Sequence, residues 1–131
     1  MRGRQYDTRK LTAAGFNIED AQIFHYKIEE YFDALTNFVE KFTIPLNNYT
    51  AAFVVNCEED RAAFLQDCYN TRAELMGMGM TAAIAELAIL EDAAIDRNMK
   101  EVADSQIKLA ATIEICIREA RDAALRWMIK R

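Results

Sequence analysis

The chain contains one histidine, one proline and four glycines among its 131 residues. Proline and glycine are the residues that interrupt helices, and 52% of the residues are hydrophobic against 28% charged. This composition argues against a disordered chain and against a turn-rich β-sandwich. A single histidine also excludes the paired Glu-x-x-His motifs of a di-iron bundle and a histidine-rich zinc site. We therefore expect an all-α protein without a metal or another cofactor.

Motifs of the common catalytic sites are also missing. The sequence has no G-x-x-x-x-G-K-[ST] or G-x-G-x-x-G phosphate loop and no G-x-S-x-G nucleophile elbow. Its cysteines, Cys57, Cys68 and Cys116, are odd in number and lack CxxC spacing, which favours reduced and buried thiols. A Cys–His nucleophile would require His25 beside one of these cysteines, which mostly fall on apolar helix rows. We expect no enzymatic activity.

The charge and hydropathy of the chain limit the partners that it can have. The net charge is −5 at pH 7, whereas nucleic-acid binding requires a clustered basic face. No apolar run approaches the ~20 residues of a membrane helix, and the first residues lack the hydrophobic stretch of a secretion signal. We expect a cytoplasmic protein that binds neither nucleic acid nor a membrane.

The chain is expected to form one domain, because its length suits a single hydrophobic core. Residues 1–10 differ from the rest in charge: they hold four cations against Asp7, namely Arg2, Arg4, Arg9 and Lys10. We predict a basic N-terminal arm of residues 1–10 and a helical domain of residues 11–131.

Apolar residues at helical spacing begin after Asn17, which is a candidate N-cap with Asp20 three positions later. The first stripe comprises Phe24, Ile28, Tyr31, Leu35, Phe38 and Phe42. It predicts one helix of about five turns. Pro45 should kink this helix or start a new one, after which Leu46, Tyr49 and Phe53 resume the stripe.

Three further helices are predicted downstream. Asn56 or Asp60 is expected to cap the second, whose inward row is Phe64, Cys68, Thr71, Leu75 and Met78, and Gly77 and Gly79 mark its exit. The third carries Met80, Ile84, Leu87, Leu90 and Ala94. The last, roughly residues 99–129 after an Asn98 cap, carries Met99, Val102, Leu109, Ile113, Cys116, Ala120, Ala123 and Trp127. Four such stripes predict an up-and-down four-helix bundle with a short extra N-terminal helix or arm.

The order of signals in "DRAAFLQDCYNTRAELMGMG" resembles the histidine-containing phosphotransfer (HPt) domain of bacterial phosphorelays. In that family an acidic cap precedes the phosphorylated histidine by nine residues, the histidine opens an H-x-x-K-G motif, and a glycine follows six residues after it. Asp60, Tyr69, Arg72, Ala73 and Gly79 stand at the corresponding places here. The later segment "LEDAAIDRN" is similar to the family's L-E-x-A-A-x-x-G-D, so the resemblance covers roughly residues 11–128.

The resemblance implies a site that has lost its nucleophile. In the family, the histidine attacks an aspartyl phosphate of a receiver domain, and the lysine three residues later favours the incoming negative charge. Tyr69 replaces that histidine, and a tyrosine with an ordinary pKa near 10 has no base in this segment to activate it. Arg72 keeps the positive charge, whereas Ala73 puts a methyl group where the family has glycine. We expect transfer through Tyr69 to fail.

The resemblance implies a receiver domain as the partner. We predict a docking patch made of Leu65, Tyr69, Arg72, Ala73 and Met76, because tyrosine and arginine are favoured as interface anchors. The alternative is a half-buried structural Tyr69 with Arg72 paired to Asp67 or Glu74. Two further hypotheses stay open, which are phosphotransfer through His25 and a structural adaptor or self-associating bundle.

Overall fold

The computed structural model describes residues 9–13, 15–21, 25, 27–41 and 49–130. The described chain is all-α, as the composition predicts. Its helices are α1 (Arg9–Ala13), α2 (Ile18–Ala21), α3 (Ile28–Lys41), α4 (Ala51–Asn56), α5 (Glu58–Met78), α6 (Thr81–Ile95) and α7 (Met99–Lys130).

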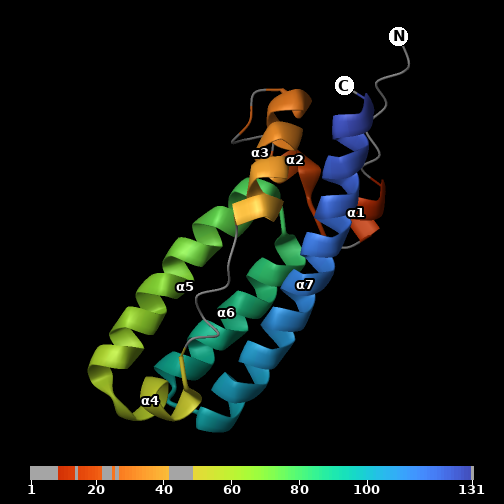
Figure 1. Ribbon diagram of the computed structural model, residues 1–131. Helices are drawn as coiled ribbons and strands as arrows, with labels where there is room; N and C mark the ends of the chain where they lie inside the picture. The colour runs from red at the N-terminus through yellow and green to blue at the C-terminus, as the bar shows by residue number, and fades with distance from the viewer. Residues whose placement is uncertain (1–8, 14, 22–24, 26, 42–48, 131) are drawn as a thin grey trace.

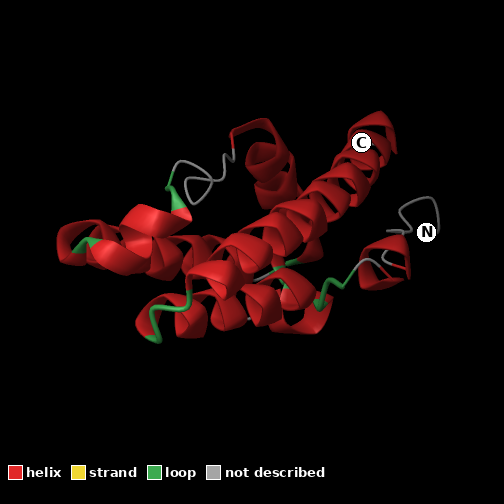
Figure 2. Cartoon of the chain, turned by 90° about the horizontal axis from the view of Figure 1, so that it is seen from below, coloured by secondary structure: helices red, strands yellow, loops and turns green. Residues whose placement is uncertain are grey.

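The long helices α5, α6 and α7 pack side by side, with α6 in contact with both of the others (Figures 1 and 2). Helix α3 packs on α7 and α5 at one end of this group, and the short α4 packs on the same two helices at the other end (Figure 1). Helix α1 lies against α7, and α2 lies against α5. Buried residues of α3 and α4 join those of α5, α6 and α7 in one hydrophobic core.

The predicted inward rows form the core. On α5 all five predicted residues are buried. Of the five predicted for the next helix, Met80 is the buried N-cap of α6, Leu87, Leu90 and Ala94 are buried within α6, and Ile84 is partly buried and packs against the core. On α7 the buried residues include Val102, Leu109, Ile113, Cys116, Ala120 and Ala123. Trp127 lies outside the residues whose side chains are described. Periodicity alone therefore located these faces, because burying an apolar stripe is what stabilises each helix in the fold.

The predicted single first helix is wrong. Helix α2 ends at Ala21 and α3 begins at Ile28, so His25 lies in neither. Asn17 does cap α2, because its Oδ1 accepts the backbone N–H of Asp20 at 3.0 Å. In α3 the predicted residues Tyr31, Leu35 and Phe38 are buried. The predictions that concern Phe24, Phe42, Pro45 and Leu46 lie outside the described residues.

Three smaller predictions are also wrong. Phe53 is 61% exposed, because α4 begins at Ala51 and turns Val54 inward in its place. Met99 is 50% exposed, because it stands in the first turn of α7 beyond the end of α6. The N-cap of α5 is Cys57, so neither Asn56 nor Asp60 takes that place.

Of the predicted basic arm, residues 1–8 lie outside the described part of the chain. Arg9 and Lys10 open α1, so the helical region begins before residue 11. Leu11 in the same helix is fully buried in the core. Within the described residues, no helix combines the length and the apolarity needed to cross a bilayer.

The turn between α5 and α6 is held by the N-terminal segment. Gly79 adopts a left-handed conformation with φ of 75°, and its N–H and that of Met80 bond back to Met76 and Leu75 as in a Schellman motif. The backbone N–H of Asn17 donates to the Gly79 carbonyl. Phe16 forms an isolated antiparallel bridge with Met80. Residues far apart in the sequence thus fix the end of α5.

Candidate partner-binding face

Tyr69 lies on the outer side of α5. Its neighbours Cys68 and Thr71 point into the core, and this rotation leaves Tyr69 64% exposed. Leu65 is partly buried and Met76 is 42% exposed. The spacing of 65, 69, 72 and 76 places these residues in one stripe along the helix. Ala73, which is exposed, follows Arg72 and lies farther round the helix. The structure therefore brings the predicted patch residues together on one side of α5.

Arg72 forms an ion pair with Glu91 of α6, and the two side chains are only 30% and 17% exposed. The alternative pairing of Arg72 with Asp67 or Glu74 is wrong. Asp67 faces the other way and accepts a 2.7 Å hydrogen bond from the hydroxyl of Tyr49. The cation that resembles the family's lysine is thus already held by a carboxylate of the neighbouring helix.

Helix α6 contributes a second stripe beside the first. This stripe consists of Ile84, Ala88, Glu91 and Ile95. Its residues are spaced by four, three and four positions, as are Leu65, Tyr69, Arg72 and Met76 on α5. The ion pair between Arg72 and Glu91 joins the third residue of one stripe to the third residue of the other. Ile95 is 60% exposed and Ala88 is exposed. We call these two stripes with Ala73 the α5–α6 face.

Sequence reasoning found only the α5 half of this face. The equal spacing of Ile84, Ala88, Glu91 and Ile95 was a usable signal. Periodicity does not show which neighbouring helix a stripe adjoins, because that depends on how the helices pack.

The chemistry available at Tyr69 is limited. Its hydroxyl makes no hydrogen bond to any described residue, so no base is positioned to take its proton. Apart from Tyr69, the residues of the α5–α6 face have apolar side chains or belong to the Arg72–Glu91 pair, and the exposed amide of Gln66 lies one turn before Tyr69. The α5–α6 face therefore has the properties of a contact surface, with apolar ends and an internally neutralised centre.

His25 lies apart from Tyr69, at the C-terminal end of α5. Its Nε2 donates to the carbonyl of Gly77 at 3.0 Å, and its ring meets that of Tyr31 edge-on at 5.8 Å. Gly77 follows Tyr69 by eight residues, which is ~12 Å along a helix axis. The structure thus gives His25 a partner among the last carbonyls of α5 and does not bring it to the predicted patch.

The cysteines are reduced thiols, and two of them are buried in the core. Burial raises the pKa of Cys68 to about 12 and that of Cys116 to about 11. A thiol is nucleophilic mainly as the thiolate, so these two are inert at neutral pH. Among the described residues, no three His, Cys, Asp or Glu side chains gather closely enough to hold a metal ion.

Comparison of the chain with protein-family models, with curated proteins and with solved structures finds no match.

Proposed function

We propose that this chain is an HPt-like signalling module of a two-component phosphorelay that does not carry phosphate and binds a receiver domain through the α5–α6 face. The main support for the proposal is the position and exposure of Tyr69. This residue occupies the position of the family's phosphorylated histidine, it is 64% exposed, and it lies in one stripe with Leu65 and Met76. A receiver that once approached a histidine here would meet an aromatic anchor instead.

The packing of the helices supports an up-and-down four-helix bundle. In this arrangement α3 and α4 act as the two parts of a broken first helix, and α5, α6 and α7 are the other three. The acceptor position falls in the middle of α5, on its outer side, where a partner has access.

Three differences argue against phosphate transfer at this position. The Tyr69 hydroxyl has no base among the described residues. Arg72, the cation that would attract phosphate, is paired with Glu91. Ala73 adds a methyl group beside the ring. Because nucleophile, charge and clearance have all changed, the site cannot attack an aspartyl phosphate as the family does.

The same differences favour binding. Tyr69, Met76 and Ile95 expose apolar surface around a charge pair that has no net charge. Aromatic side chains and arginine contribute most to protein interfaces, and a neutralised centre lowers the penalty of excluding water.

Titration against a panel of receiver domains from the same organism tests the proposal. We expect binding to one receiver, and we expect Tyr69→Ala to weaken it by about tenfold, as for an interface anchor. Ile107→Ala is the matched control, because Ile107 is 70% exposed on α7 and lies outside the α5–α6 face. Failure of every receiver to bind, or an equal effect of the two variants, would refute the docking role.

Transfer from a phosphorylated receiver tests the second half of the proposal. We expect no stable label on this chain. Acid-labile label that disappears in His25→Ala would instead establish the phosphotransfer hypothesis for His25.

Self-association is a second candidate function, because Tyr69, Met76 and Ile95 would suit a second copy of the chain equally well. Sedimentation at two concentrations separates the two functions. A monomer at both concentrations excludes self-association, and a dimer that Tyr69→Ala dissociates supports it.

A further inference from the structure

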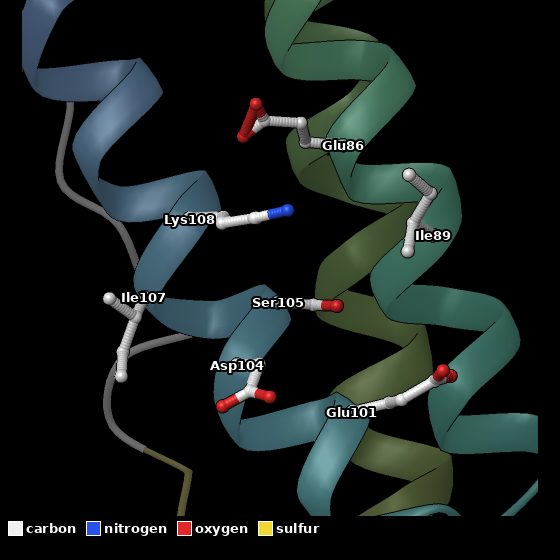
Figure 3. A pocket seen from close by; sticks show the side chains of 7 residues that line it. All are labelled: Glu86, Ile89, Glu101, Asp104, Ser105, Ile107 and Lys108. Carbon is white, nitrogen blue, oxygen red and sulfur yellow. The ribbon is translucent and has the colours of Figure 1, made fainter.

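A groove runs between α6 and α7, on the side of α6 away from the Arg72–Glu91 pair (Figure 3). Its volume is about 470 Å³, within the range of small-molecule sites. The carboxylates of Glu86, Glu101 and Asp104 line it together with a single ammonium group, that of Lys108. Three carboxylates against one ammonium leave the groove net negative. It plays no part in the proposed receiver binding.

Ser105 gives this groove a buried polar group. The residue is 8% exposed, and Figure 3 shows its hydroxyl aimed across the groove toward α6. The Ser105 hydroxyl makes no hydrogen bond to any residue that the structure describes. Burying a hydroxyl without a partner is unfavourable, and a ligand that supplies the partner would remove this penalty.

The carboxylates are spread along the groove instead of converging on a point. Glu86 is fixed on the α6 side, where both of its oxygens accept the Thr112 hydroxyl at 2.6 and 2.7 Å. Thr112 and Glu101 are eleven residues apart on α7, which is ~16 Å along the helix axis. Among the described residues no set of three such groups can hold a metal ion. The arrangement suits an extended cation better than a compact one.

The α6 wall of the groove is apolar at Ile89, whereas from α7 the ammonium of Lys108 projects into the groove between Glu86 and Ser105 in the view of Figure 3. Ile89 projects from α6 beside Ser105, between Glu86 and Glu101 in the view of Figure 3, and is 57% exposed. A ligand that fits all of these groups has positive charges separated by methylene units and carries N–H donors.

We propose that the α6–α7 groove binds a linear aliphatic polyamine. Its ammonium groups pair with Glu86 at one end and with Asp104 and Glu101 at the other. Its methylene chain lies on Ile89, and one of its N–H groups donates to the Ser105 hydroxyl. The bound polyamine neutralises the excess of carboxylates and pairs the buried hydroxyl.

Calorimetric titration of the full chain with spermidine tests this proposal. Ser105→Ala should weaken binding by about tenfold, because it removes a hydrogen bond to a charged donor. Asp104→Asn should weaken it by about threefold, as expected for an exposed ion pair. Glu114→Gln is the matched control, since it removes one carboxylate from an exposed position on α7 that does not line the groove. It should leave the affinity unchanged.

Diffuse attraction to an acidic protein predicts a different result. In that case Asp104→Asn and Glu114→Gln would weaken spermidine equally, Ser105→Ala would have no effect, and magnesium chloride would compete as well as spermidine at equal charge. Any of these outcomes would overturn the proposal. N-acetylspermidine, which has the same chain with one charge fewer, should bind more weakly to the unmodified protein.

Stability measurements distinguish a loss of spermidine binding from a destabilised fold in Ser105→Ala. Without spermidine, Ser105→Ala should melt at or above the temperature of the unmodified protein, because alanine removes a buried hydroxyl that has no hydrogen-bond partner among the described residues. With saturating spermidine, the unmodified protein should gain thermal stability and Ser105→Ala should gain less. A variant that already melts lower without ligand would show that Ser105 has a partner within the fold, and the proposal would fail.

Discussion

The hydroxyl of Tyr31 in α3 donates a 2.9 Å hydrogen bond to the carbonyl of Met78, the last residue of α5. The carbonyls in the last turn of a helix receive no hydrogen bond from a backbone N–H of the same helix, so this carbonyl requires a donor from elsewhere. Tyr31 is fully buried, and burial raises the pKa of its hydroxyl, which therefore stays protonated as a donor. With His25 on the Gly77 carbonyl, this bond joins the N-terminal segment to the end of α5.

Replacing Tyr31 by phenylalanine should destabilise the protein by about 1–3 kcal/mol, because it leaves the buried Met78 carbonyl unsatisfied while the ring remains. Urea denaturation measures the free energy of unfolding. Tyr69→Phe is the control: it makes the same chemical change at an exposed hydroxyl and should change stability by less than about 0.5 kcal/mol. Equal effects of the two variants would contradict the capping role of Tyr31.

The two glycines at the end of α5 should respond to alanine with opposite signs. At Gly79 a Cβ would lie 2.3 Å from the Asn17 carbonyl oxygen, and φ is 75°, so Gly79→Ala should cost more than about 2 kcal/mol. At Gly77 a Cβ would meet nothing within 4 Å, so Gly77→Ala should stabilise the helix by about 0.5–1 kcal/mol. Thermal denaturation gives both values, and destabilisation by Gly77→Ala would argue against the described helix end.

The stability of the protein should fall as the pH rises above 9. Cys68 and Cys116 have an ordinary pKa of 9.0, and burial raises these values in the folded state to about 12 and about 11. Between pH 9 and 11 the unfolded thiols release protons that the folded thiols keep, which favours the unfolded state. Below pH 9 both states are protonated, and this contribution to stability is fully present.

Urea denaturation at pH 8, 9, 10 and 11 tests this dependence. The double variant Cys68→Ala and Cys116→Ala should show a shallower decline. The remainder is owed to Tyr31, whose pKa is raised by burial, and to Tyr49, whose pKa is raised to about 12 mainly by its hydrogen bond to Asp67. A decline of equal slope in the double variant would contradict the assignment to the thiols.

If the chain is an altered HPt module, restoring its nucleophile should restore some chemistry. We expect Tyr69→His to accept phosphate slowly from the receiver that binds the chain. The combination of Tyr69→His with Glu91→Gln should accept it faster, because the substitution at Glu91 frees Arg72 to attract the phosphoryl group. Glu74→Gln is the matched control, since Glu74 is exposed on α5 and is not the partner of Arg72.

Radiolabel transfer and its acid lability are the measurements. No label on Tyr69→His from a receiver that binds it would count against the equivalence of Tyr69 and the family's histidine. Equal rates with Glu91→Gln and Glu74→Gln would show that the Arg72–Glu91 pair does not restrain the site.

Prediction from the sequence succeeded for features that depend on a single helix, namely its buried row and its N-cap. The inward row of α5 is buried at all five predicted positions, and Asn17 and Asn98 cap their helices with side-chain bonds to Asp20 and Glu101. Spacing along one helix decides these features, because neighbours at three and four positions share a face. The exposure of Tyr69 follows from the same spacing.

The sequence by itself thus determined the helical class, the buried rows and the stripe that carries Tyr69. Only the tertiary structure decided the break between α2 and α3, the pairing of Arg72 with Glu91, and the roles of His25 and Tyr31 at the end of α5. Each of these depends on contacts between residues far apart in the chain. Such contacts form only when helices pack in a particular order and register, which local periodicity does not specify.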